Sequence, residues 1–147
     1  MLQADLADVL AIHALKARYF RTMDSKDWDG LRACFTDDLI ADFRQSTGGW
    51  DEAQLIHGAD AYLTMIAPML AEVSTVHHGH MPEIEFTGAD EASGIWAMED
   101  KLWVNEGSAL PFKWLHGYGH YHEQYRKDGG VWRIAAIKLT RLRVDAG

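Results

Sequence analysis

Two clusters of histidines are the first feature of this sequence that points to chemistry. They are His77-His78-Gly79-His80 and His116-Gly117-Tyr118-Gly119-His120-Tyr121-His122. Histidine changes its charge near neutral pH, so an imidazole can take up or release a proton under physiological conditions. Its ring nitrogens are also metal ligands. The clusters therefore predict either acid–base chemistry or a metal site.

A carboxylate on an otherwise apolar strand face is the second feature. Asp100 lies in the middle of a strand, on the face that also carries Met98 and Leu102. A buried carboxylate must be paired, hydrogen-bonded or shifted in pKa. We therefore expect Asp100 either to form a structural ion pair with an arginine or to orient a histidine and stabilise its charged form.

A tyrosine and an aspartate near the end of the first predicted helix are the third feature. Tyr19 and Asp24 are five positions apart, which is about 500° of rotation in a helix with 3.6 residues per turn. They share a face only if the helix ends or loosens between them. Each residue alone is also compatible with a plain structural role, Tyr19 as a core aromatic and Asp24 as a loop carboxylate.

The elements that must position these residues follow from the hydrophobic spacing. Apolar residues three and four positions apart predict a first helix over residues 5–23. Further predicted elements are a short helix over 28–35 capped by Asp27, a strand over 39–43, a helix over 59–72 that Pro68 bends or ends, and strands over 84–87, 93–104, 118–126 and 131–143. Helices followed by a meander of long strands predict an α+β fold, with a curved sheet wrapped on the helices and a small ligand in its concave face.

Composition limits the class of protein. The chain has 147 residues, which predicts a single domain over 1–147, and its net charge of −8 argues against nucleic acid or an anionic membrane as partner. No apolar stretch approaches the roughly 20 residues that span a bilayer. The N-terminus lacks the basic segment of a secretory signal, and Cys34 is the only cysteine, so we expect a cytoplasmic protein.

Longer motifs link these features to a known family. They are Ala17-Arg18-Tyr19-Phe20-Arg21-x-x-Asp24 with Trp28-Asp29, Val76-His77-His78-Gly79-His80-x-Pro82-Glu83-Ile84, Gly94-x-Trp96-x-x-Glu99-Asp100-x-Leu102, Tyr125-x-Lys127-x-Gly129-x-x-Trp132-x-Ile134, and Arg141. Across nearly its whole length the sequence resembles the SnoaL-like branch of the NTF2-like superfamily. Within that branch it is most similar in motif to the bile acid 7α-dehydratases of gut bacteria.

The resemblance implies an NTF2-like α+β cone with a deep apolar pocket and a site that needs no cofactor or metal. The matching catalytic positions are Tyr19, Asp24, His77, Asp100 and Arg141. Scytalone dehydratase is similar in pairing a tyrosine and a histidine with carboxylates. The residues expected to contact the substrate are His78, Trp96, Met98, Tyr118, His120 and His122. Tyr118, His120 and His122 share one strand face, and if that face points inward the pocket is more polar than a bile acid pocket.

Removing water from a β-hydroxy ketone needs a base for the acidic C–H and an acid for the departing hydroxyl. His77 can do either task. We expect Asp100 to hold one of its ring nitrogens protonated and Tyr19 to donate a hydrogen bond to the carbonyl oxygen or the leaving group. Arg141 would stabilise negative charge or keep Asp24 or Asp100 ionised. The resemblance thus implies a cofactor-independent lyase, a dehydratase, that acts on a hydrophobic cyclic hydroxy-ketone such as a steroid, terpenoid or polyketide.

The register of the histidine strand stays open in the sequence. Simple alternation back from Ile84 places His78, and not His77, on the same face as Ile84. Only the family match selects His77. A bulge at Gly79 or near Pro82 would shift the register and reconcile the two.

Three other functions remain open at this stage. An isomerase or a polyketide cyclase begins with the same proton abstraction, with Asp24 or Asp100 as an alternative base. A non-catalytic binding protein can use the same cone for a small molecule. A metal enzyme would use His120-x-His122, with His78-x-His80 and Glu123 as further ligands.

Self-association is expected by resemblance. Members of the superfamily commonly form dimers or trimers through the convex face of the sheet, and we favour a trimer. Trp103 lies on the strand face opposite Asp100 and is a candidate for that interface.

Overall fold

One curved sheet and three helices make up the computed structural model, which describes residues 5–147. The strands are β1 (Phe35–Asp42), β2 (Leu55–His57), β3 (Val73–Gly88), β4 (Glu91–Val104), β5 (Trp114–Asp128) and β6 (Val131–Ala146). The helices are α1 (Leu6–Asp24), α2 (Trp28–Arg32) and α3 (Ala59–Leu70), with a 3-10 turn η1 (Glu52–Gln54). The strand order is β2-β1-β6-β5-β4-β3, and only β1 and β6 run parallel.

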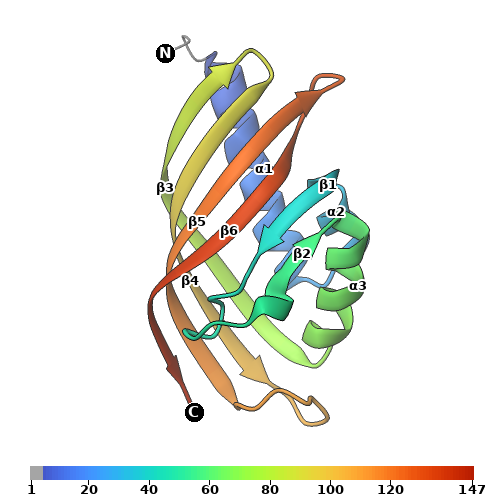
Figure 1. Cartoon of the computed structure of the whole chain (residues 1–147), viewed down its shortest axis with the longest axis vertical. Coiled ribbons are helices and arrows are strands. Elements are labelled where there is room, and N and C mark those ends of the chain that lie inside the picture. Colours follow the sequence, from blue (N-terminus) through green and yellow to red (C-terminus); the bar gives the residue numbers. More distant parts are fainter. Residues whose placement is uncertain (1–4) are drawn as a thin grey trace.

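The four long strands β3–β6 curve around the helices, with α1 across the upper part of the concave face and α3 beside its lower part (Figure 1). The predicted α+β fold, with helices packed in a curved and mostly antiparallel sheet, is confirmed. The first helix ends at Asp24, one residue after the predicted end. Among the described residues, no helix is long and apolar enough to cross a membrane.

The first helix begins and ends with well-defined local contacts. Asp5 caps it by accepting a hydrogen bond from the Ala7 N–H at 2.9 Å. Four apolar side chains at helical spacing, Ile12, Leu15, Tyr19 and Met23, are at most 2% exposed and pack on the sheet.

After Asp24 the chain turns sharply through Lys26. This residue has a left-handed φ of 61°, which ends the helix. Asp27 then caps α2 by accepting from the Gly30 N–H at 3.0 Å, as its type and position predicted. The turn fixes where the last residue of α1, Asp24, lies relative to the sheet.

Several predicted boundaries differ from the structure. The helix predicted over 28–35 stops at Arg32, and β1 starts at Phe35. The strand predicted over 84–87 is only the end of β3, which starts at Val73. Its first half was not predicted because a run of histidines gives no clear apolar alternation. Pro68 does not end α3, which continues to Leu70. The short strand β2 was not predicted.

Two register shifts decide which side chains face the concave side. Between His80 and Glu83 of β3 one extra residue is inserted opposite β4, and Met81 in that bulge is 93% exposed. Opposite Tyr118 and Gly119 of β5, the partner residues on β6 are 143 and 141, so β6 also carries one extra residue. Both bulges lie beside the residues that the sequence singled out.

Candidate active site

A cavity of about 440 Å³ lies between the concave face of the sheet, the ends of α1 and α3, and the loops 43–54 and 105–113. Its wall is mostly apolar, with aliphatic, methionine and phenylalanine side chains. These are Met23, Phe43, Met65, Ile66, Met69, Leu70, Leu102, Leu110, Pro111, Phe112, Leu115 and Leu139. A volume of this size suits a small organic ligand, and the few polar groups in the wall would orient it.

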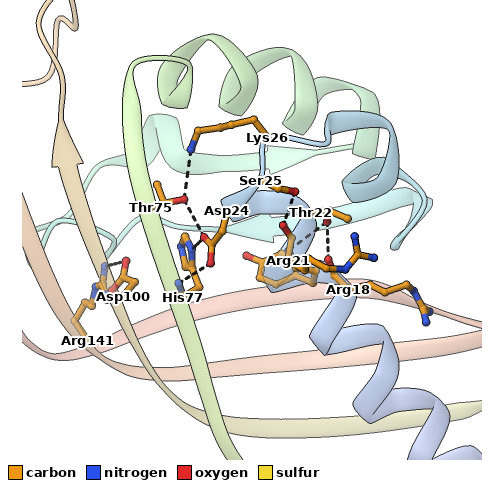
Figure 2. A network of polar contacts seen from close by, with 11 residues as sticks. Arg18, Arg21, Thr22, Asp24, Ser25, Lys26, Thr75, His77, Asp100 and Arg141 are labelled. Atoms are coloured by element: carbon orange, nitrogen blue, oxygen red, sulfur yellow. Dashed lines mark hydrogen bonds and ion pairs between the residues drawn. The ribbon is translucent and has the colours of Figure 1, made fainter.

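The first polar group in this wall is His77, which is paired with Asp24. The Oδ1 atom of Asp24 lies 2.6 Å from Nδ1 of His77, and Oδ2 accepts the backbone N–H of His77 at 2.9 Å. Figure 2 shows Asp24 reaching from the end of α1 to His77 on β3. Because Nδ1 is used by the carboxylate, Nε2 is the ring nitrogen left for a ligand.

Asp24 is itself held by a second strand residue. The Thr75 hydroxyl donates to Asp24 Oδ1 at 2.9 Å, and Lys26 Nζ donates to Thr75 Oγ1 at 3.4 Å. Burial acts to raise the pKa of Asp24, but the hydrogen bonds from His77 and Thr75 outweigh it, so the pKa is lowered. Asp24 is therefore a fixed, ionised carboxylate at neutral pH.

The bulge in β3 determines which histidine faces the cavity. The His77 side chain is 9% exposed and lines the cavity, whereas the side chains of His78 and His80 are 60% and 56% exposed on the outer face. Simple alternation back from Ile84 is wrong because of the extra residue between His80 and Glu83. The bulge lies near Pro82, one of the two places where the sequence allowed it.

The second polar group is the ion pair of Asp100 and Arg141. Arg141 Nη1 lies 2.5 Å from Asp100 Oδ1, and Nη2 lies 3.1 Å from Oδ2, in a bidentate arrangement. Asp100 is paired with His77 in the register of β3 and β4, but its carboxylate turns to Arg141. The prediction that Asp100 orients the histidine is therefore wrong: Asp24 has that contact, and Asp100 forms the ion pair that was the alternative.

Arg141 also fixes a loop at the cavity mouth. Its Nε and Nη2 donate to the backbone carbonyl of Ser46 at 2.9 and 2.8 Å, and Nη1 points at the Met98 sulfur at 3.7 Å. Together with the two bonds to Asp100, these contacts account for all five N–H groups of a guanidinium. Arg141 thus lines the cavity with its donors already used.

Gly117 makes room for this ion pair. It lies opposite Asp100 on β5, and a Cβ there would overlap both the Arg141 guanidinium and the Asp100 carboxylate. Gly117 was not predicted as a site residue. The available signal was a small residue on the inner face of a strand that is otherwise rich in bulky side chains.

The third polar group is a cluster of tyrosine hydroxyls. Tyr19 from α1, Tyr62 from α3 and Tyr121 from β5 line the cavity, and each is 1% exposed. Tyr19 packs edge to face on Tyr121, with ring centroids 6.0 Å apart. Burial raises the pKa of all three phenols, so they stay protonated and act as hydrogen-bond donors. Only Tyr19 was predicted from the sequence.

Four residues predicted to contact the substrate lie elsewhere. His78 is on the outer face of β3, and Tyr118, His120 and His122 are on the outer face of β5. The inner face of β5 instead carries the odd-numbered residues, among them Tyr121, since burial alternates along this strand and places residues 118, 120 and 122 on the opposite side. The prediction that these four line the pocket is wrong.

Trp96 and Met98 face inward, as predicted, but they lie behind the cavity wall. Trp96 is 6% exposed and its Nε1 donates to the Tyr125 hydroxyl at 2.8 Å. Met98 is 4% exposed and its sulfur contacts Arg141. Met98 thus contacts a residue of the wall, Arg141, whereas Tyr125 is not part of the wall, and neither Trp96 nor Met98 lines the cavity itself.

The alternative set of metal ligands is not brought together. The rings of His120 and His122 lie 6.3 Å apart on the outer face, and His122 Nε2 is bonded to the Thr140 hydroxyl at 3.0 Å. Glu123 points to the opposite, buried side. Across residues 5–147, no group of three or more His, Cys, Asp or Glu side chains has the geometry to hold a metal ion.

The fold and the cavity together define a small α+β domain whose curved sheet borders an apolar cavity lined by His77 and three tyrosines. A family model described as the SnoaL-like domain matches residues 4–138. The chain therefore belongs to the SnoaL-like family of the NTF2-like superfamily. The fold predicted by resemblance is confirmed at the level of the family.

Known relatives agree with this assignment. Scytalone dehydratase arp1 of Aspergillus fumigatus is 31% identical over 146 residues, which cover 95% of this chain and 84% of that protein. Scytalone dehydratase-like protein AacuK of Aspergillus aculeatus is 29% identical over 139 residues, covering 89% and 77%. The solved structure of a hexachlorocyclohexane dehydrochlorinase, LinA type 2, has a TM-score of 0.79 at 19% identity, covering 97% of this chain and 90% of that one. The two scytalone dehydratase relatives thus support an enzyme of this family, and the dehydrochlorinase structure supports the fold.

Proposed function

We propose that this protein is a cofactor-independent lyase that eliminates water next to the carbonyl group of a small, hydrophobic, cyclic hydroxy compound. The observation that carries the proposal is the Asp24–His77 pair, which leaves one imidazole nitrogen free in an apolar cavity. An imidazole held in this way is suited to take a proton from carbon at neutral pH.

In the proposed reaction, His77 Nε2 removes the proton from the carbon next to the carbonyl group. The electron pair of that C–H bond moves to the carbonyl oxygen as an enolate, and then forms a carbon–carbon double bond as the C–O bond to the hydroxyl breaks. The hydroxyl leaves as water with a proton returned by the imidazolium or relayed by Tyr19. Asp24 stabilises the imidazolium while it carries the proton.

The tyrosine cluster supports the same reaction. Tyr19, Tyr62 and Tyr121 are neutral donors, and such donors stabilise the negative charge that develops on oxygen. Arg141, with its donors occupied by Asp100 and Ser46, acts in this proposal by positioning Asp100 and the loop.

For the substrate we propose a compact polycyclic molecule. The apolar wall and the volume of about 440 Å³ favour fused rings with few polar groups. The relatives named scytalone dehydratase favour a polyketide-type substrate, and the motif resemblance to bile acid 7α-dehydratases favours a steroid. A terpenoid of similar size fits the same description.

The test uses purified protein without a His-tag in buffer containing EDTA. Scytalone and a 7-hydroxy-3-oxo-4-ene steroid are supplied separately, and dehydration is followed by the absorbance of the more conjugated product. The same samples in D2O are examined by NMR for deuterium at the carbon next to the carbonyl. Dehydration of either compound supports the proposal. Exchange or rearrangement without dehydration would favour an isomerase or cyclase, and binding without either would favour a carrier.

We also propose that the protein works in the cytoplasm as a homo-oligomer, with a trimer favoured. The outer sheet face carries three partly exposed apolar side chains, Ile95, Trp103 and Trp114, which are 37–44% exposed. Cys34 is a free, buried thiol, which suits a reducing compartment. Sedimentation velocity of wild type and Trp103→Glu tests the association, and a monomeric wild type would contradict it.

A further inference from the structure

A buried ion pair lies directly behind two tyrosines of the cavity wall. Lys16 of α1 and Glu123 of β5 approach with Nζ and Oε1 2.9 Å apart, and both side chains are fully buried. Desolvation lowers the pKa of Lys16 to about 8 and raises the pKa of Glu123. Neither residue lines the cavity, so neither touches a ligand there.

The ammonium group of Lys16 is enclosed by aromatic rings. Its Nζ lies 3.8 Å from the ring centroid of Tyr19, 3.8 Å from that of Tyr121 and 4.8 Å from that of Phe20. Tyr19 and Tyr121 meet edge to face, with centroids 6.0 Å apart. A desolvated cation is attracted to the face of an aromatic ring, so Lys16 holds two rings that come from different elements.

Stability alone is a weak reason for such a pair. Replacing a buried ion pair by apolar side chains of similar volume is often neutral or stabilising. The rest of this region is a packed apolar core into which methionine and leucine would fit chemically. What apolar residues would lack is the directional contact of Lys16 with the faces of Tyr19 and Tyr121.

The hydroxyls of these tyrosines keep their protons. Tyr19, Tyr62 and Tyr121 line the cavity, and burial raises the pKa of all three phenols, so each is a neutral O–H group at neutral pH. Such a group can donate a hydrogen bond to a ligand oxygen in the cavity. The direction of that bond depends on the orientation of the rings.

We propose that Lys16, held in place by Glu123, is a positioning residue that orients Tyr19 and Tyr121 so that Tyr121 joins Tyr19 as a hydrogen-bond donor to the substrate oxygen that becomes negative. This inference rests on the proposed function for the identity of that oxygen. It adds two residues, Lys16 and Glu123, that act through the tyrosine rings and never contact the substrate.

The experiment removes the whole pair rather than half of it. Lys16→Met alone leaves a buried carboxylate without its partner, which is expected to destabilise the protein. The Lys16→Met/Glu123→Leu double variant restores an apolar interior. Its matched control is Lys127→Met, because the Lys127–Asp8 pair (3.0 Å) also joins β5 to α1 but contacts no residue of the cluster. Tyr19→Phe and Tyr121→Phe are made in wild type and in the double variant.

The readouts are the unfolding temperature, the fluorescence-detected Kd for 2-naphthol, whose oxygen mimics an enolate on a fused ring, and kcat and KM on any substrate that wild type converts. We expect the double variant to unfold near the wild-type temperature while its Kd for 2-naphthol rises about tenfold, which corresponds to about 1.4 kcal/mol. Tyr121→Phe should weaken binding in wild type and have little further effect in the double variant. The loss in turnover should be in kcat.

A stable double variant that binds 2-naphthol as tightly as wild type would overturn the proposal and leave the pair a structural one. So would wild type that fails to bind 2-naphthol, or a Lys127→Met variant with an equal loss. Failure of the proposed function has a different signature, because wild type would then convert none of the substrates while the binding differences among the variants persist.

Discussion

The carboxylate of Asp24 contacts both the ring and the backbone of His77, at 2.6 Å from Nδ1 and 2.9 Å from the amide nitrogen. One aspartate therefore sets both the position of the strand residue and the orientation of its imidazole. The last residue of α1 is joined to β3 in this way, across 53 positions of sequence. Because Thr75 donates to the same carboxylate, the geometry does not depend on the histidine alone.

Replacing His77 and His78 by phenylalanine in separate variants should show that only the inner face of β3 contributes to activity. His77→Phe is expected to lower kcat/KM by roughly 10²–10⁴, the contribution of a general base. His78→Phe should change it less than about twofold, because that side chain is 60% exposed on the outer face. Steady-state kinetics on a converted substrate is the measurement. Equal losses in the two variants would contradict the orientation of the strand.

Asp24→Asn should keep the fold and lose most of the activity. The amide can still accept the His77 N–H, but it neither stabilises an imidazolium nor selects the same ring tautomer. In the Ser-His-Asp triad the equivalent change costs roughly 10⁴ in kcat, and we expect about 10²–10⁴ here. Thermal unfolding should show a small change beside this loss. Asp51→Asn, which changes a carboxylate in the cavity wall away from His77, is the control, and full activity of Asp24→Asn would refute the assigned role.

The lowered pKa of Asp24 also predicts an acid limit to stability. The folded-state pKa is below the unfolded value, so this group adds stability above the unfolded pKa, which is lost as the pH falls through the folded one. Wild type should therefore lose more free energy of unfolding than Asp24→Asn does when urea titrations are compared between pH 6 and pH 3. Identical pH dependence in the two proteins would show that Asp24 contributes nothing to it.

Much of this arrangement is readable from the sequence, and the limits have identifiable causes. Apolar residues at helical spacing, among them Tyr19 and Met23, predicted α1, and the resemblance supplied Asp24 and His77. The buried positions Ile12 and Leu15 were not among the residues on which that prediction rested. Strand alternation assigned the wrong histidine to the inner face because a bulge near Pro82 changes the register. A bulge of this kind interrupts the alternation and has no periodic sequence pattern of its own.

The partners of charged groups were harder to predict than the groups themselves. Asp100 was expected at His77, its neighbour in register, but a bidentate arginine from β6 competes better for a buried carboxylate. The fully buried Lys16 was not predicted as a site residue, because no local sequence pattern indicates its partner Glu123 more than a hundred positions away. Tertiary packing alone brings such pairs together.

Breaking the Asp100–Arg141 pair should destabilise the protein more than it changes the chemistry. Arg141→Met leaves Asp100, 5% exposed, without its partner and releases the Ser46 carbonyl, at a cost of about 3–5 kcal/mol. Arg141→Lys should recover only part of this because one ammonium cannot make the bidentate contact and reach Ser46 as well. Urea unfolding measures the difference. Arg143→Met on the exposed side of β6 is the control and should cost less than about 0.5 kcal/mol.

Gly117→Ala should disrupt the same ion pair through sterics, without touching a charge. The added methyl group would overlap the Arg141 guanidinium and the Asp100 carboxylate, and the strand cannot retreat because β4 and β6 flank it. Overpacking of this kind costs about 1–3 kcal/mol, and we expect a loss of stability in the upper part of that range with a smaller effect on activity. Gly49→Ala in the loop at the cavity mouth has open space around it and should behave like wild type. If Gly117→Ala were as stable and active as Gly49→Ala, the close approach of these three residues in the folded protein would be refuted.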